Sequence, residues 1–74
     1  MKLIEMKPGD KAQISSILKG GNFQRKMFEM GIMPGVQIEL IARHPFRGPL
    51  LIKVGQSQVA LGRGVAAALD VEAK

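Results

Sequence analysis

The stretch that decides the fold is GGNFQRKMFEMGIMPG, residues 20–35, which reads as a short helix followed directly by a tight turn. Asn22 is predicted to be the N-cap, because its side-chain carbonyl can accept a hydrogen bond from a free backbone N–H of the first turn. Gly31 is predicted to end the helix in a left-handed conformation, which glycine adopts without a Cβ clash. Pro34 and Gly35 then favour a type II turn.

The predicted helix has one apolar side. At about 100° per residue, Phe23, Met27 and Met30 share a narrow stripe that we expect to be buried. The opposite side is polar and carries Arg25, Lys26 and Glu29. Phe28 lies outside the apolar stripe, so its ring is expected at the edge of the core, where an aromatic beside an arginine suits an interface. The alternative is that Phe28 covers one end of a small core as ordinary packing.

Outside this helix the hydrophobic period is two, which is typical of half-buried strands. Ala12, Ile14 and Ser16 are expected on the buried side of the first strand. Further strands are predicted over residues 36–40, 50–54, 58–61 and 69–71, with a short alanine-rich helical turn over residues 63–69. Short strands joined by turns, with one helix after the first strand, favour a mostly β fold, a small closed or nearly closed β-barrel that forms a single domain over residues 1–74.

A basic loop is predicted over residues 43–49, RHPFRGP. Pro45 and Pro49 cannot donate to a strand ladder, and Gly48 loosens the backbone between them. Phe46 is expected to be exposed in this loop. Phe46 and Arg47 are therefore candidate partner-binding residues, together with the helical residues Arg25, Lys26 and Phe28.

Composition and charge narrow the function classes. The 74-residue chain has no cysteine, which fits a reducing compartment, and it shows neither a signal peptide nor an apolar run long enough to span a bilayer. A soluble, cytoplasmic protein is expected. The formal net charge of +5 favours acidic partners, meaning nucleic acid, anionic lipid or an acidic protein surface.

Residues along the whole chain resemble the ferrous iron transport protein A (FeoA-like) family. The most specific match is the helix-turn signature, which consists of Arg25-Lys26-Met27, Glu29-Met30-Gly31-Ile32 and Pro34-Gly35. This resemblance implies an SH3-like small β-barrel that works in the cytoplasm, or at the inner membrane through its partner. It also implies a non-catalytic accessory role in iron transport, through interaction with the membrane ferrous iron transporter that has a GTP-binding domain.

Similar domains also occur at the C-terminus of metal-dependent transcription repressors. This sequence has no DNA-binding helical region upstream, so the resemblance favours the freestanding transporter accessory. A nucleic-acid-binding or metal-regulator-like small β-barrel is the alternative. Weak self-association stays open.

The resemblance brings in ferrous iron, a transition metal ion, but this chain offers few ligands for it. Iron sites commonly use imidazole and carboxylate groups that converge, whereas the chain has one histidine and six dispersed acidic residues. His44 stands between Arg43 and Arg47, which disfavour a cation. Met27 and Met30 are better explained as flexible core residues. Neither a metal site nor a cofactor is expected.

Catalysis and nucleic-acid binding are also disfavoured by the residues. Ser15, Ser16 and Ser57 have no neighbouring base in any nucleophile motif, and no phosphate-binding loop motif is present, so no catalytic residue is expected. Nucleic-acid-binding barrels usually place stacking aromatics among basic residues on their strands. This chain has three phenylalanines and no tyrosine or tryptophan, so a protein partner is favoured over nucleic acid.

Overall fold

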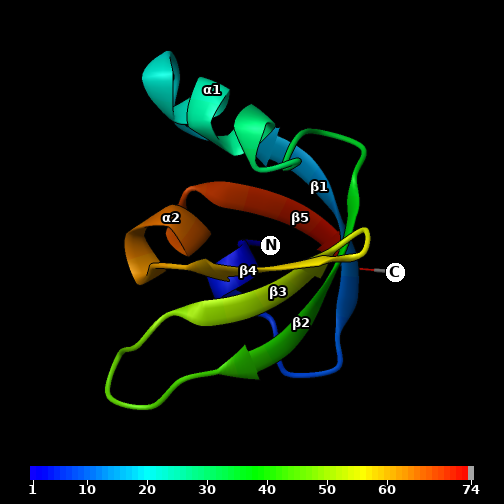
Figure 1. Ribbon diagram of the computed structural model, residues 1–74, viewed down its shortest axis with the longest axis vertical. Coiled ribbons are helices and arrows are strands. Elements are labelled where there is room, and N and C mark those ends of the chain that lie inside the picture. Colours follow the sequence, from blue (N-terminus) through cyan, green and yellow to red (C-terminus); the bar gives the residue numbers. More distant parts are fainter. Residues whose placement is uncertain (74) are drawn as a thin grey trace.

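A five-stranded antiparallel sheet forms the body of the computed structural model, which describes residues 1–73 (Figure 1). The strands are β1 (Lys11–Ile17), β2 (Gln37–Arg43), β3 (Leu50–Val54), β4 (Ser57–Leu61) and β5 (Leu69–Ala73). Their order across the sheet is β4-β3-β2-β1-β5. The sheet curls on itself, and β4 and β5 are its two edges. This is the mostly β, barrel-like architecture that the sequence predicts.

Three short helices complete the chain. The 3-10 helix η1 (Leu3–Glu5) precedes β1, α1 (Asn22–Glu29) connects β1 to β2, and α2 (Arg63–Ala67) connects β4 to β5. In Figure 1, α2 lies on the concave side of the sheet close to the N-terminal segment, while α1 stands at one end of the sheet. The predicted helix after the first strand and the alanine-rich helical turn are both confirmed, whereas η1 carries no clear sequence signal.

The core is the concave side of the sheet. Alternate strand residues are buried there, and Leu3, Met6 and Met27 close it from the helical segments. The strand contribution is Ala12, Ile14, Ile38, Leu40, Leu50, Ile52, Val54, Leu61, Leu69 and Val71. Among residues 1–73, no charged or polar residue is buried. Burial of apolar area is therefore the main source of stability, as in other small domains.

The second half of β1 departs from the predicted alternation. The pairing of β1 with β5 shifts register between Ile14 and Ser16, so one extra residue is accommodated in a β-bulge. Beyond the bulge, Ile17 packs against the core, and Ser16 does not continue the buried row of Ala12 and Ile14. The placement of Ser16 on the buried side was wrong, because alternation alone does not reveal a bulge.

The start of α1 also differs from the prediction. The N-cap is Gly21, and no side chain makes a capping hydrogen bond there, so Asn22 is the first helical residue and not the cap. Gly21 has φ = 60° and ψ = −123°, a conformation that glycine adopts much more readily than other residues, and it reverses the chain between β1 and α1. Glycine is tolerated at N-caps, and the requirement for positive φ outweighs the side-chain hydrogen bond that asparagine would supply.

The end of α1 is confirmed as predicted. Gly31 has φ = 81°, and its N–H donates to the carbonyl of Phe28 at 2.9 Å. The N–H of Ile32 donates to the carbonyl of Met27 at 2.8 Å. These two bonds make a Schellman motif, which satisfies carbonyls that the last helical turn leaves free.

The Pro34-Gly35 turn joins the helix to the sheet. Gly35 has φ = 95°, and the N–H of Val36 donates to the carbonyl of Met33 at 3.1 Å, as in a type II turn. Backbone hydrogen bonds of 2.8 and 2.9 Å then link Gly35 and Val36 to Ile14 of β1. The predicted turn is confirmed, and these bonds fix α1 relative to β1.

Candidate partner-binding surfaces

The first candidate surface is the outer side of α1, formed by Arg25, Lys26 and Phe28. Met27 is only 1% exposed, whereas Phe28 leaves 63% of its surface exposed. The two side chains point apart because neighbouring helical residues are separated by about 100°. Phe28 therefore does not cover the core. Arg25 and Lys26 are exposed, and neither is paired with a carboxylate, since the ion pair found in residues 1–73 joins the N-terminal amine to Asp70.

The second candidate surface is the tip of the β2–β3 hairpin, formed by Phe46 and Arg47. The chain reverses within Pro45–Gly48, where the N–H of Gly48 donates to the carbonyl of Pro45 at 3.1 Å. Phe46 and Arg47 both have positive φ, 57° and 61°. Positive φ at both central residues is the pattern of a type I′ turn. Phe46 is 99% exposed, so its ring touches almost nothing of this chain.

The base of this tip is held in place. Arg43 is the last residue of β2, not part of the loop as predicted, and its Nη1 donates to the carbonyls of Ile4 at 2.6 Å and Met6 at 2.9 Å. The N–H of His44 donates to the carbonyl of Pro49 at 3.1 Å. At Gly48 an added Cβ would lie 2.9 Å from the Cβ of His44, so this glycine is needed for close approach of the two loop arms and not for looseness.

The two candidate surfaces lie at opposite ends of β3. The end of α1 is next to Val54, because a Cβ added at Gly31 would lie 3.7 Å from Val54 Cγ1. The hairpin tip instead precedes Leu50, the first residue of β3. A five-residue strand spans about 13 Å at roughly 3.3 Å per residue. Figure 1 shows the same separation between α1 and the β2–β3 loop. The structure therefore does not bring the five sequence-predicted residues into one site.

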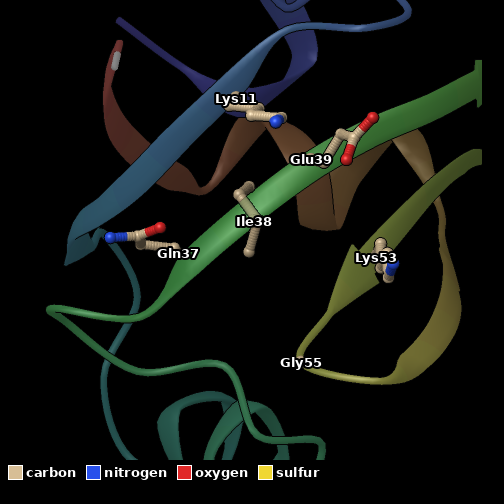
Figure 2. Close-up of a pocket in the computed structure, with 6 residues that line it drawn as sticks. All are labelled: Lys11, Gln37, Ile38, Glu39, Lys53 and Gly55. Carbon is tan, nitrogen blue, oxygen red and sulfur yellow. The ribbon is translucent and has the colours of Figure 1, made fainter.

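A shallow depression on the sheet was missed by sequence reasoning (Figure 2). Its volume is about 290 Å³, and its lining residues are Lys11, Gln37, Ile38, Glu39, Lys53 and Gly55. Glu39 on β2 lies in register with Lys11 on β1 and with Lys53 on β3, which makes a row of alternating charge across three strands. These residues are far apart in the sequence, so only the strand register could have revealed the row.

The acidic residues and the histidine of the described chain lie apart from one another. Within residues 1–73, no three of the histidine, aspartate and glutamate residues gather in an arrangement that could hold a metal ion. His44 is exposed in the β2–β3 loop. None of the helices over the same residues has the length and apolar character needed to cross a membrane.

The curled sheet and its exposed side chains define a class, a small SH3-like domain with two separate candidate surfaces for a partner. The family model for the FeoA domain matches residues 1–73, and the chain belongs to this family. A crystal structure of an iron uptake regulatory protein, FeoA, is 39% identical to this chain, covers 100% of it and 97% of its own length, and has a TM-score of 0.93. The resemblance on which the sequence prediction rests is confirmed.

Two further relatives are described in connection with ferrous iron transport. FeoA of Stenotrophomonas maltophilia, solved with zinc and described as a prokaryotic SH3 domain protein, is 26% identical, with a TM-score of 0.83 over 97% of this chain and 89% of its own. An Fe(2+) transport protein A/Fe(2+) transporter FeoB fusion protein of Porphyromonas gingivalis is 33% identical over 72 residues, 97% of this chain. This chain spans only 8% of that protein's length.

A manganese-dependent transcriptional repressor shares the fold as well. Its TM-score is 0.90 over 100% of this chain and 41% of the repressor, at 23% identity. At that identity the likeness concerns the fold alone. The SH3-like fold class is confirmed by these comparisons, and the repressor adds no argument about function.

Proposed function

We propose that this chain is a single FeoA-type domain that serves a ferrous iron uptake system as a non-catalytic accessory. It works in the cytoplasm, or at the inner membrane through its partner, by binding the membrane ferrous iron transporter that has a GTP-binding domain. The observation that carries the proposal is the Porphyromonas gingivalis relative, which is named as a fusion of transport protein A with the transporter FeoB. Fusion of two modules in one chain gives each a high effective concentration for the other, which favours their contact.

The outer side of α1 is the contact surface that we place first. Phe28 is an exposed aromatic residue, and Arg25, three residues earlier on α1, lies about 60° from it around the helix. Lys26 is also exposed but lies roughly 160° from Phe28, on the other side of Arg25. Aromatic residues and arginine are enriched among residues that carry binding energy at protein interfaces. The core does not need the ring of Phe28, so this exposed apolar area is available for a partner.

Nucleic acid is not the partner that this proposal assigns. The outward row Lys11–Glu39–Lys53 alternates in charge, while a phosphate-binding groove needs basic residues that track a backbone. Glu39 in the middle of the row would repel a phosphate. The exposed aromatic residues are Phe28 on α1 and Phe46 in the β2–β3 loop, at opposite ends of β3, which does not suit the stacking of successive bases.

The test is a pull-down of the purified chain against the full-length transporter in detergent, with and without GTP. The wild-type chain is expected to bind. The double variant Arg25→Glu with Phe28→Ala is expected to lose binding while it keeps its melting temperature. Gln24→Ala, an exposed substitution on the same helix, is the matched control and should bind normally. Absence of wild-type binding under all conditions would contradict the proposed function.

A further inference from the structure

The hairpin tip holds a strained backbone. Type I′ turns are dominated by Asn-Gly and similar pairs, because both central residues need positive φ. Here the two positions are Phe46 and Arg47, with φ of 57° and 61°. A bulky L-residue in the left-handed region is a conformational outlier, and such outliers gather at functional sites. Nothing in the core requires Phe46, which is 99% exposed, so the strain serves no packing purpose.

The tip is also fixed in direction. The hydrogen bonds from Arg43 to the N-terminal segment anchor the end of β2, and the bond from His44 to Pro49 closes the loop at its base. Pro45 and Pro49 further restrict φ within the loop. A loop backbone that is held in its bound conformation before association loses less conformational entropy on binding. The tip therefore has the preorganisation of a binding anchor.

The residues of the tip and those that follow it in the chain, as far as Leu69, carry charges of one sign. Residues 40–69 contain no aspartate or glutamate, and their basic residues are Arg43, Arg47, Lys53 and Arg63. All six acidic residues of the chain lie in residues 1–39 and 70–73. Glu39 of β2 lies outside residues 40–69, and Glu5 of η1 stands between the two residues whose carbonyls Arg43 contacts. The tip, β3, β4 and α2 themselves contain no carboxylate side chain. This part complements an acidic surface and repels both free cations and a second copy of itself.

We propose that the hairpin tip is a preformed anchor that places the ring of Phe46 in an apolar pocket of a protein partner whose rim is acidic. Arg47 pairs with a carboxylate on that rim, a contact that its planar guanidinium can make with two hydrogen bonds. This inference rests on the proposed function, because the partner is the cytoplasmic surface of the ferrous iron transporter. The tip adds a second contact at the opposite end of β3 from α1.

An anionic membrane surface is the alternative binding partner for an exposed tip that carries a phenylalanine and an arginine. One inserted ring gives little attachment, since even a single myristoyl chain gives only marginal and reversible binding. The guanidinium of Arg43 is already bonded to the N-terminal segment, which leaves Arg47 as the free arginine of this loop. A fluid lipid surface also gains nothing from a tip backbone that is fixed in advance. A protein pocket fits these observations better.

The first part of the test measures the strain. The double variant Phe46→Asn with Arg47→Gly gives the tip a sequence that prefers the type I′ conformation. Its melting temperature is expected to rise by about 5 °C, since relief of such strain in a small domain has effects of this order. The matched control Gln56→Ala changes the exposed β3–β4 turn and should melt as the wild type does. A fall in melting temperature for the double variant would contradict the strained tip.

The second part measures binding to the full-length transporter in detergent by calorimetry. Phe46→Ala is expected to weaken binding by about thirtyfold or more, as for an interface hot spot. Arg47→Glu should weaken it and reduce its dependence on salt, while Gln56→Ala should bind normally. If the wild type and all tip variants bind alike, the tip inference is wrong and the proposed function stands. If the wild type does not bind, the proposed function and this inference fall together.

Vesicles containing phosphatidylglycerol provide the third part. The wild-type chain is expected to sediment with them no more than Phe46→Ala does. Sedimentation that depends on Phe46, together with transporter binding that does not, would assign the tip to lipid and overturn the protein anchor.

Discussion

At the residue scale, glycines show how one position can fix a local structure. Gly31 has φ = 81° in the Schellman motif that ends α1. A Cβ at this position would meet Val54 Cγ1 at 3.7 Å, which is ordinary van der Waals contact. The need for glycine here is therefore one of backbone conformation and not of space. At Gly48, in contrast, glycine is needed for space and not for backbone conformation, because an added Cβ would lie 2.9 Å from the Cβ of His44.

Substitution of Gly31 by valine is expected to destabilise the fold by about 1–2 kcal/mol or more, because a β-branched residue strongly disfavours the left-handed region. Chemical denaturation gives the free energy of unfolding. Gly20→Val is the control, since Gly20 has open space around it and its φ lies outside the left-handed region. An unchanged unfolding free energy for Gly31→Val would show that the helix end does not depend on this conformation.

A second residue-scale prediction concerns metal. Under anaerobic conditions near neutral pH, we expect the purified protein to show no stoichiometric ferrous iron site with a Kd tighter than roughly micromolar. A Kd of that size corresponds to a binding free energy of about 8 kcal/mol. The reason for this expectation is the dispersal of its histidine and carboxylates over the described residues 1–73. Anaerobic calorimetry makes the measurement, with His44→Ala as the comparison. A saturable site that His44→Ala removes would overturn this prediction.

At the element scale, two neighbouring residues of α1 differ sharply in their burial. Met27 lies in the core and Phe28 leaves it, although both are large and apolar. The helical period decides this difference, because the helix rests on the sheet along one stripe only. Sequence periodicity located the stripe, in which Met27 is buried while Phe23 and Met30 are partly buried against the core. The structure adds that Arg25, Lys26 and Phe28 on the outer side of α1 are exposed.

Alanine substitutions at these two positions should therefore have different effects. Met27→Ala is expected to cost about 2–5 kcal/mol of unfolding free energy, as for buried methionine. Phe28→Ala should cost less than about 1 kcal/mol, because most of its ring is already in water. Denaturant unfolding of both variants measures the difference. A loss of roughly 3–5 kcal/mol in Phe28→Ala would mean that the ring is packed and that α1 is not an open contact surface.

At the scale of the whole molecule, the sheet holds the α1 surface and the hairpin tip apart. Each surface alone is small, but together they could contact a partner along the length of the barrel. The two surfaces also differ in charge, since α1 carries both signs, with Arg25, Lys26 and Glu29, whereas residues 40–69, which include the tip, contain no aspartate or glutamate. In the proposed function, these two surfaces would contact two sites of the transporter at once.

Because the two surfaces are separated by the length of β3, changes at them should act independently on stability. The effects of Gly31→Val and of the double change Phe46→Asn with Arg47→Gly are expected to add within about 0.5 kcal/mol. Denaturant unfolding of the wild type, of each variant and of the combined variant gives the unfolding free energies of a double-mutant cycle. A larger coupling energy would show that strain at one end of the barrel is transmitted to the other.

The sequence by itself determined the features that depend on residues within one turn or one strand. The apolar stripe of α1, its end at Gly31, the Pro34-Gly35 turn and the alternation in β2 and β3 all follow from local periods and from backbone preferences. The mostly β fold class follows from the order of these elements along the chain. The helix-turn signature was the most specific sequence evidence for the family.

Only the tertiary structure decided the features that depend on pairing between distant segments. The bulge in β1 arises from its register with β5, and the row Lys11–Glu39–Lys53 exists only because three strands lie side by side. The same holds for the distance between the two candidate surfaces and for the strained tip, whose Phe-Arg sequence does not indicate positive φ. The physical reason is range: propensities act over a few residues, whereas register and strain are set by the long-range contacts of the folded chain.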